Sequence, residues 1–469
     1  MNDSTTLDRG GKSIASLMAA LLVAIFAFQL NASMLSPALT TMQRELGTTS
    51  SAIALSQTMF FTAAALFSLF LPRLADLAGR KKVLVGMLIA TMAGCIVSAL
   101  APNLTVLMVG RILQGVSGPV VPLCLIMLHE RITEKKRYVR LMAILTSVNG
   151  GIGGVDAIMG GCLAGTWGFR SVFWVMALVC IIAVAMVVLF AEESRASETE
   201  KMDWVGVAFL VVAVGAALLG INEAEKLAAA DWPVVAAFVA IAAVSFIAFW
   251  RVEGRNQHPM VSTRYLRQRR TWALLSTTVL TMTGVFAIMN GIIPALAQDA
   301  SYGAGLSADV VSFATLTPYA LAGLAFGPVA GVLASKFGYR MVLRGGLVLT
   351  IVGVVFGIYV SNSPSIWALV VMSLAVGITY AGTANIMLNG LGIVLSPKDN
   401  TGYLPGLNAG AFNLGAGISF AVLYAVMNAV AQANGTTAGY VGSLIAGAVL
   451  LLLALLVSLL IPDPEKLED

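Results

Sequence analysis

The feature that most constrains this chain is a series of apolar runs, each long enough to cross a lipid bilayer. A bilayer core about 30 Å thick takes about 20 apolar residues in a helix. Because 58% hydrophobic and only 11% charged residues do not suit a soluble surface, the sequence predicts an all-α polytopic membrane protein. The fourteen runs begin near Ile14, Ala52, Val83, Leu104, Leu141, Ser171, Trp204, Val234, Trp272, Val310, Met341, Ile366, Leu404 and Tyr440.

Lys and Arg are distributed unevenly between the predicted loops. If the amino terminus is cytoplasmic, the inside segments hold 24 basic residues, whereas the outside loops hold three, Arg44, Arg170 and Lys226. Cytoplasmic loops of membrane proteins are enriched in basic residues. We therefore expect a multi-pass protein of the bacterial plasma (inner) membrane with both termini cytoplasmic. The net charge of +5 is then an orientation signal, and no nucleic-acid partner is expected.

Two polar breaks divide the chain into six helices, two helices and six helices. The predicted parts are a cytoplasmic tail (1–13), a six-helix bundle (14–191), a linker (192–203), a two-helix insert (204–250), a basic loop (251–271), a second six-helix bundle (272–461) and a cytoplasmic tail (462–469). The basic loop suits a solvated segment beside anionic lipid headgroups.

Several kinds of chemistry lack the residues that they need. No G-x-x-x-x-G-K-[ST] phosphate loop is present, so ATP-driven transport is not expected. The two histidines, His129 and His258, do not combine with the scattered cysteines into a metal site. We expect no enzyme activity, no metal and no cofactor. The cysteines fall in apolar runs, where we expect them to be buried: Cys95, Cys124, Cys162 and Cys180.

A short motif occurs twice, after the second and after the tenth predicted helix. The first copy, from Pro72, reads PRLADLAGRKK, and the second, from Gly331, reads GVLASKFGYR. A turn glycine lets two helices meet closely, and an acid at a helix end can pair with basic groups. We interpret the motif as a cytoplasmic gate, and a positive-inside anchor is the alternative. The candidate gating residues are Asp76, Gly79, Arg80, Lys81, Gly331, Gly338 and Arg340.

The repeated motif resembles the pattern G-x-x-x-D-[RK]-x-G-x-[RK] of the major facilitator superfamily. The fourth helix, from Gly110, reads GRILQGVSG and resembles the R-x-x-Q-G motif of the same superfamily. The resemblance implies two six-helix bundles around a central cavity, and alternating access by rocking of the bundles.

Other stretches resemble the fourteen-helix drug:proton antiporter branch of that superfamily. The run WGFRSVF from Trp167 looks like its W-R-x-x-F, and Asp203-Trp204 looks like the start of its two-helix insert. In the fifth helix, only Gly160-Gly161 matches the antiporter signature G-x-x-x-G-P-x-x-G-G. Asn31 stands where the branch usually has Asp, and Asn413 lies where it often has Arg-Gln-x-Gly.

Arg111 and Asp156 are the ionisable residues placed deep in the predicted spans. A charge at that depth is costly unless it faces a wet cavity or a partner. A carboxylate in apolar surroundings binds a proton more readily than one in water, as a proton-coupled carrier needs. We predict that Asp156 is the proton site and that Arg111 takes part in coupling. A structural role between helices is the alternative for each.

Neutral polar residues form the candidate lining of a substrate cavity. For any one of them helix packing is the alternative, and only the set indicates a cavity. The set is Asn31, Gln57, Gln114, Asn149, Asn290, Tyr319, Asn385, Asn389 and Asn408.

The resemblance implies a secondary transporter, driven by the proton gradient, that exports amphipathic or cationic compounds and confers drug and antibiotic resistance. We expect a monomer whose partners are its substrate, protons and membrane lipids. The alternative is a carrier, exporter or importer, for one cellular metabolite, because the antiporter signature is degenerate. A membrane sensor or scaffold is a third interpretation, which a large soluble domain would favour.

Overall fold

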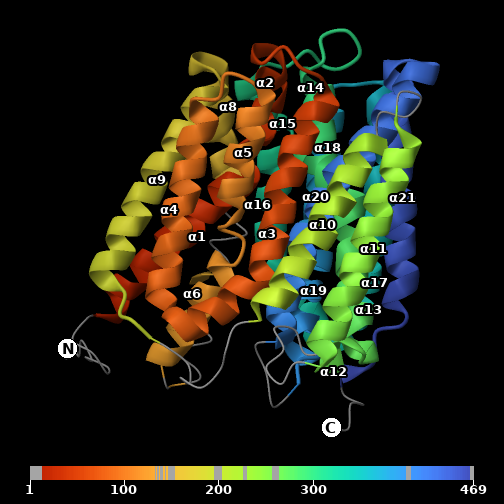
Figure 1. Ribbon diagram of the computed structural model, residues 1–469. Helices are drawn as coiled ribbons and strands as arrows, with labels where there is room; N and C mark the ends of the chain where they lie inside the picture. Colours follow the sequence, from red (N-terminus) through yellow and green to blue (C-terminus); the bar gives the residue numbers. More distant parts are fainter. Residues whose placement is uncertain are drawn as a thin grey trace, which may run out of the picture.

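Long helices that run side by side make up the structure (Figure 1). The computed structural model describes residues 13–132, 134, 137, 141–142, 144–145, 154–194, 203–224, 230–255, 263–397 and 403–464. In this part of the chain the elements are all helical, and thirteen helices are long and apolar enough to span a membrane. The predicted all-α membrane fold is confirmed. The fourteenth run, from Leu141, lies partly outside the described residues and ends in α8 (Val155–Trp167).

The remaining elements follow the chain in order. The first half contains α1 (Ile14–Ser33), η1 (Ser36–Ala38), α2 (Leu39–Glu45), α3 (Ser50–Ala78), α4 (Arg80–Ala99), α5 (Leu104–Gly115), α6 (Val120–Arg131), α8 and α9 (Phe169–Phe190). Next come α10 (Trp204–Ala224), α11 (Trp232–Arg255) and α12 (Thr263–Leu266). The second half contains α13 (Arg269–Ala287), η4 (Ile288–Ile292), α14 (Ile293–Gln298), α15 (Ala308–Ala314), α16 (Leu316–Phe337), α17 (Tyr339–Asn362), α18 (Ile366–Val376), η5 (Gly377–Ala384), α19 (Asn385–Val394), α20 (Tyr403–Asn434) and α21 (Thr436–Ser458).

Several helices extend beyond the predicted apolar runs. The expected basic loop is helical at both ends, because α11 continues to Arg255 and α13 begins at Arg269. Long basic side chains can keep their charge in the headgroup region while the helix continues through it. A span defined by hydropathy is therefore shorter than the helix that contains it. The last helix instead ends at Ser458, before the predicted boundary at 461.

Polar side chains cap the starts of several helices, where the first backbone N–H groups have no partner within the helix. The side chains of Ser13, Thr49, Asn103 and Ser365 accept hydrogen bonds from backbone N–H groups at the starts of α1, α3, α5 and α18. Such caps satisfy donors that the helix itself cannot. They fix where these spans start.

Four glycines with positive φ turn the chain between consecutive helices. Gly79 (φ 113°) joins α3 to α4, and Gly338 (φ 80°) joins α16 to α17. Gly168 (φ 78°) joins α8 to α9, and Gly435 (φ 93°) joins α20 to α21. Other residues rarely adopt this backbone conformation. The tight turns therefore recur at equivalent places in the two halves, as the repeated motif predicts.

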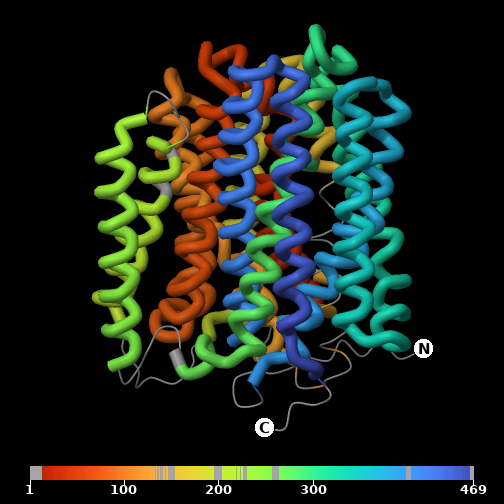
Figure 2. The backbone as a smooth tube through the Cα atoms, turned by 90° about the vertical axis from the view of Figure 1, so that its right-hand side faces the viewer, coloured from red at the N-terminus to blue at the C-terminus, as the bar shows by residue number. Residues whose placement is uncertain are grey.

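Two long contacts join the halves, one between α3 and α20 and one between α8 and α15. We call the two ends of the bundle the Gly79 end, where α3 meets α4, and the Pro37 end, where α1 leads into η1. The pair α10 and α11, which pack on each other, lies at one edge of the molecule, and α16 and α17 lie at the opposite edge (Figure 2).

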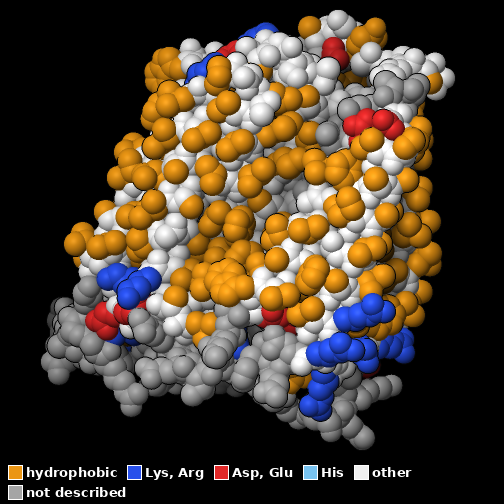
Figure 3. Space-filling model, viewed as in Figure 1, with side chains coloured by type: hydrophobic (Ala, Val, Ile, Leu, Met, Phe, Trp, Pro, Cys, Tyr) orange, Lys and Arg blue, Asp and Glu red, His pale blue; other side chains and the backbone are white. Residues whose placement is uncertain are grey.

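Apolar side chains cover the middle of the visible face, and Lys and Arg gather near one rim (Figure 3). Many large apolar residues are exposed, among them Leu178, Val244 and Val352. Such a surface suits hydrocarbon rather than water. The cysteine prediction holds for Cys95, Cys124 and Cys180, which are buried, but is wrong for Cys162, which is exposed. Cys162 lies on a helix face that the bundle does not cover, which apolar character alone does not reveal.

Candidate functional site: a buried arginine and a buried aspartate

Arg111 on α5 is fully buried and surrounded by oxygen atoms of neutral groups. Its guanidinium donates to the side-chain oxygens of Gln57 on α3 and Gln114 on α5. Two of its nitrogens also donate to the backbone carbonyl of Asn31 on α1, each at 3.4 Å. The planar fork of donors suits several acceptors at once. One arginine thereby connects three helices of the first half.

The surroundings of Arg111 are packed as well as polar. Its Cζ lies 4.3 Å from the centroid of the Phe60 ring, a cation–π contact. Gln114 donates from Nε2 to Ser98 Oγ at 2.9 Å, which fixes the orientation of that amide. Gln57 Nε2 and Arg111 Nε are buried without a recorded partner in the described residues. Both donors are closed off from solvent in this conformation and would gain a partner only if the site opened.

Asp156 on α8 is 1% exposed and accepts a hydrogen bond from Ser33 Oγ, at the end of α1. Gln29 Nε2 donates to the same hydroxyl at 3.0 Å. The second oxygen of Asp156, Oδ1, has no recorded partner among the described residues. A buried carboxylate with one unsatisfied oxygen is stabilised by a proton.

Arg111 and Asp156 do not form an ion pair in the described part of the chain, although both contact the last turns of α1. Arg111 binds the carbonyl of Asn31, and Asp156 binds the side chain of Ser33. The two side chains thus share contacts with neighbouring groups of α1, while Arg111 also bonds to α3 and α5. A movement of the end of α1 would change the hydrogen bonds of both Arg111 and Asp156.

Gly160 and Gly161 explain why α8 can approach two neighbours at once. A Cβ on Gly160 would collide with the backbone carbonyl oxygen of Met34, at the end of α1. A Cβ on Gly161 would collide with the carbonyl oxygen of Ala308, on α15 of the other half. Small residues allow such close backbone contacts between membrane helices. The glycine pair therefore positions Asp156 beside the boundary between the halves.

The predicted cavity residues of the second half do not meet around one space. Asn408 is buried, accepts from Thr278 Oγ1 at 2.7 Å and donates to the Leu388 carbonyl at 3.2 Å. Tyr319 stacks against Tyr380, with ring centroids 6.5 Å apart. These contacts join helices within one half, as in the packing alternative.

The other polar side chains in the set bond mainly to their own helices. Asn290 donates to the Phe286 carbonyl at 3.1 Å. Asn389 is exposed and bonds to the carbonyl and side chain of Asn385. Asn31 donates to the Ala27 carbonyl at 2.8 Å. Asn149 lies outside the described residues.

Two cavities of the described part of the chain have volumes of about 280 and 190 Å³. The first lies between α16, α17 and η5, and the second is lined by residues at the ends of α6 and α9. Neither is lined by a residue of the predicted set. The network around Arg111 and Asp156 lies apart from both of these cavities and is the candidate site.

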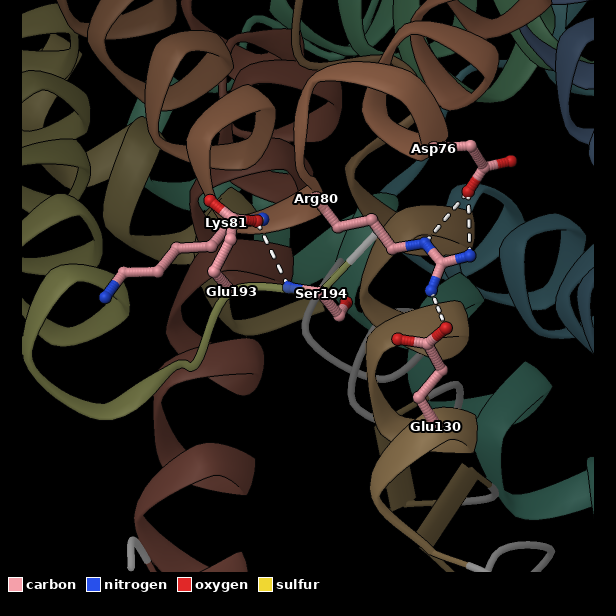
Figure 4. Close-up of polar contacts among 6 residues, drawn as sticks. All are labelled: Asp76, Arg80, Lys81, Glu130, Glu193 and Ser194. Atoms are coloured by element: carbon pink, nitrogen blue, oxygen red, sulfur yellow. Dashed lines mark hydrogen bonds and ion pairs between the residues drawn. The ribbon is translucent and has the colours of Figure 1, made fainter. Parts of the chain in front are cut away.

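The first gating motif forms a charged cluster at the Gly79 end (Figure 4). Arg80 donates from Nε to Asp76 at 2.9 Å, and it also pairs with Glu130 on α6. The backbone N–H of Lys81 donates to Glu193 Oε1 at 3.0 Å. A Cβ on Gly79 would lie 2.7 Å from that carboxylate, so a larger residue here would have to move the Glu193 side chain as well as adopt a positive φ. The described contacts lie within the first half.

The second copy of the motif also bonds to a carboxylate that follows the last helix of its half, although the residues differ. Arg340, which corresponds to Lys81, donates to Asp463 Oδ2 at 2.6 Å and to the Ile461 carbonyl at 3.3 Å. In each half an acid after the last helix thus bonds to the motif. A Cβ on Gly331 meets nothing within 4 Å, so close packing does not explain that glycine.

Contacts between the halves are concentrated away from the Gly79 end. Asn428 on α20 donates to Ser51 Oγ at 2.8 Å and accepts from Ser50 Oγ at 3.3 Å. Thr58 Oγ1 donates to the Gly417 carbonyl at 3.1 Å. Gln298 donates to the Pro37 carbonyl at 3.3 Å. In the described residues the recorded hydrogen bonds between halves extend from the Pro37 end to the middle of the bundle.

Two residues of this network were not predicted from the sequence: Ser33 and Ser98. Ser33 is 123 positions from Asp156, and Ser98 is 16 from Gln114. A small hydroxyl in an apolar run gives no distinct pattern. The one available signal is that Ser33 follows Asn31 in a short polar stretch at the end of the first span.

Comparison with known proteins gives two informative relatives. A family model described as Major Facilitator Superfamily matches residues 21–303 and 274–469. The uridine/deoxyuridine transporter of Lactococcus lactis subsp. cremoris (strain MG1363) is 62% identical over 416 residues, which cover 88% of this chain and 87% of that protein. The multidrug resistance protein Stp of Mycobacterium tuberculosis (strain ATCC 25618 / H37Rv) is 27% identical over 365 residues, which cover 76% and 66% of the two chains.

Among solved structures, a crystal structure of a POT family transporter in complex with a thioalcohol conjugated peptide matches with a TM-score of 0.70. The two chains are 13% identical, and the match covers 97% of this chain and 98% of the other. At this identity the likeness concerns the fold alone.

Proposed function

The chain belongs to the major facilitator superfamily, and from this premise we propose that it is a carrier for uridine and deoxyuridine. The observation that supports the proposal is the 62% identity, over most of both chains, to a uridine/deoxyuridine transporter. The chain is thus a multi-pass membrane protein of a transporter family, and the nucleoside substrate is our inference.

The prediction of drug efflux is wrong. The multidrug relative is only 27% identical, whereas the nucleoside transporter is 62% identical over a larger share of the chain. The alternative interpretation, a carrier for one metabolite, is the better supported. The motifs misled the prediction because they belong to the transport machinery, which relatives with different substrates share.

The chemistry of the buried network suits a neutral substrate. Uridine is uncharged at neutral pH, and its base presents two carbonyl acceptors and one N–H donor, which an amide side chain can complement. Gln57 offers such an amide, and its buried Nε2 has no recorded partner in the described residues. The guanidinium of Arg111 and one carboxylate oxygen of Asp156 are hydrogen-bonded to neutral protein groups, an environment that does not require a charged substrate.

We propose that transport is coupled to protons through Asp156. Its contact with Ser33 lies at the end of α1, and the next residue, Ala157, accepts a hydrogen bond from Ser312 of the other half at 2.8 Å. Protonation would change the charge of a buried group beside the boundary between the halves. That change can favour one access state over the other.

We also propose the fourteen-helix plan with both termini cytoplasmic. The pair α10 and α11 supports it, because these two long apolar helices pack against each other and touch the first half through α3. The orientation rests on the distribution of Lys and Arg in the sequence.

The test is uptake of radiolabelled uridine into proteoliposomes with an imposed pH gradient. We expect uptake above that of empty liposomes, competition by unlabelled deoxyuridine, and no competition by the lipophilic cation tetraphenylphosphonium. Transport of the cation without transport of uridine would refute the proposal. Uridine uptake at the same rate with and without the pH gradient would refute proton coupling but not the nucleoside substrate.

A further inference from the structure

An apolar groove lies between α16 and α17 and is lined by their side chains and by η5. These two helices lie at the edge opposite α10 and α11 (Figure 2). The groove has a volume of about 280 Å³. Phe326, Leu333 and Phe337 of α16 form one wall, Met341 and Leu349 of α17 form the other, and η5 forms the floor. This groove is distinct from the buried network and from the first gating cluster, and it adjoins the second gating turn at Gly338.

The groove is open to the membrane rather than to the interior of the bundle. Phe337, Met341 and Leu349 are each more than half exposed, at 57%, 65% and 55%. From Phe337 to Phe326 the helix rises about 16 Å at about 1.5 Å per residue. One leaflet contributes about half of a hydrocarbon core about 30 Å thick. The length of the groove along α16 therefore matches the thickness of one leaflet, so that it can hold a single acyl chain that enters from the Gly79 end.

The charge at the mouth of the groove indicates the kind of lipid. Lys336, in the last turn of α16, is exposed beside Phe337. Arg340 is the second residue of α17, next to Met341, and its guanidinium is bonded to Asp463. Basic residues at the ends of membrane helices attract anionic headgroups. Apolar walls below an exposed cation match an anionic phospholipid.

We propose that this groove binds one anionic phospholipid of the leaflet at the Gly79 end. Its acyl chain lies between α16 and α17, and its phosphate lies near Lys336. The occupant touches α17, which begins at the second gating turn, and η5, a π-helical segment. Such irregular segments are frequent at functional sites.

Gly345 allows the groove to be filled without disturbing the helices. It lines the groove, and a Cβ built on it meets nothing within 4 Å. Gly331 on α16 is equally open but does not line the groove, so it supplies a matched control. Gly345→Leu should occupy the space of the acyl chain, and Gly331→Leu should not. Both variants carry the same substitution on an exposed helix surface.

The experiment uses the full chain in nanodiscs that contain phosphatidylglycerol with a photoreactive group at the end of an acyl chain. After illumination, mass spectrometry locates the adducts. We expect adducts on peptides containing Phe326 to Leu349, their loss in Gly345→Leu, and their retention in Gly331→Leu. Unchanged labelling in a monodisperse Gly345→Leu protein would overturn the proposal, and so would dimers crosslinked through this face in place of lipid adducts.

The headgroup is tested separately, by competition between phosphatidylglycerol and phosphatidylcholine. Wild type should prefer the anionic lipid, and Lys336→Gln should lower this preference by about fivefold. Equal labelling by the two lipids in wild type would show that the groove takes hydrocarbon of any kind, which contradicts the assignment of an anionic ligand.

Discussion

Arg111 keeps a charge in the protein interior by hydrogen bonding to neutral oxygens alone among the described residues. Each acceptor, from Gln57, Gln114 and Asn31, belongs to a group that would be buried without that donor. An unsatisfied buried polar group costs about 1–3 kcal/mol. The arrangement is therefore sensitive to the shape of the cation as well as to its charge.

The first prediction compares two arginines given the same substitution. Arg111→Lys keeps the charge but loses the planar fork, so uridine uptake should fall by about tenfold or more, the equivalent of one unsatisfied group. Arg170→Lys is the control, because that side chain is 41% exposed and its ion pair with Glu45 lies at the surface. Initial uptake rates in proteoliposomes give the comparison. Equal rates for the two variants would show that Arg111 is not part of the transport machinery.

The second prediction concerns the proposed proton site. Asp156→Asn cannot exchange a proton, so uptake driven by a pH gradient should be lost while counterflow of uridine between equal pools continues. Asp309→Asn, a half-buried acid in the first turn of neighbouring α15, should behave as wild type. Ser33→Ala should weaken coupling without abolishing it. If Asp156→Asn still responds to the gradient as wild type does, the residue is structural and another group carries the proton.

At the scale of elements, the structure separates two reasons for a glycine at a gating turn. Gly79 and Gly338 both have positive φ, but only Gly79 lies against a side chain, that of Glu193. A positive φ costs a non-glycine residue about 1–2 kcal/mol. The two turns lie at equivalent places in the two halves. A substitution at Gly338 meets backbone strain alone, whereas one at Gly79 also meets the side chain of Glu193.

The third prediction follows from this difference. Gly338→Ala should lower stability through backbone strain alone, whereas Gly79→Ala should lower it further because its Cβ displaces Glu193 from Lys81. Thermal unfolding in detergent measures both.

In transport assays, Gly79→Leu and Asp76→Asn should reduce turnover more than uridine binding, because the gate affects the balance of access states. Weakened binding with normal turnover would contradict the gate.

The fourth prediction concerns the contact of α20 with α3. Asn428→Ala removes both hydrogen bonds to Ser50 and Ser51, so the Pro37 end should open more often. A cysteine at Thr58 should then react faster with a membrane-impermeant thiol reagent. Asn362→Ala is the control, because that amide bonds within α17. No change in reactivity with Asn428→Ala would mean that apolar packing alone closes this end.

At the scale of the whole molecule, the sequence was sufficient for the class of fold and for the depth of the two charges. Apolar length predicts spans, and a charge within a span stands out. The partners could not be predicted, because Gln57 and Arg111 are 54 positions apart and Asn408 and Thr278 are 130 apart. Only the packing of helices brings such pairs together. The substrate could not be predicted either, since amides and hydroxyls recognise many neutral molecules.

The fifth prediction tests the orientation of the molecule. Cysteines at Asn103 and Asn434, both at the Pro37 end, should react with an impermeant thiol reagent added outside intact cells. A cysteine at Lys398 should react only after the membrane is opened. The opposite pattern would reverse the assignment of the cytoplasmic side.

The uneven distribution of hydrogen bonds between the halves has a consequence for kinetics on the two faces of the membrane. Under the proposed function, a uridine molecule that arrives from the Pro37 side can bind only after the contacts of Asn428, Thr58 and Gln298 are broken. In the part of the chain that the structure describes, the recorded hydrogen bonds between the halves do not extend to the Gly79 side. When only a fraction of carriers is open to a given side, the apparent affinity from that side is reduced by the same fraction. Half-saturation in right-side-out vesicles should therefore require more uridine than in inverted vesicles.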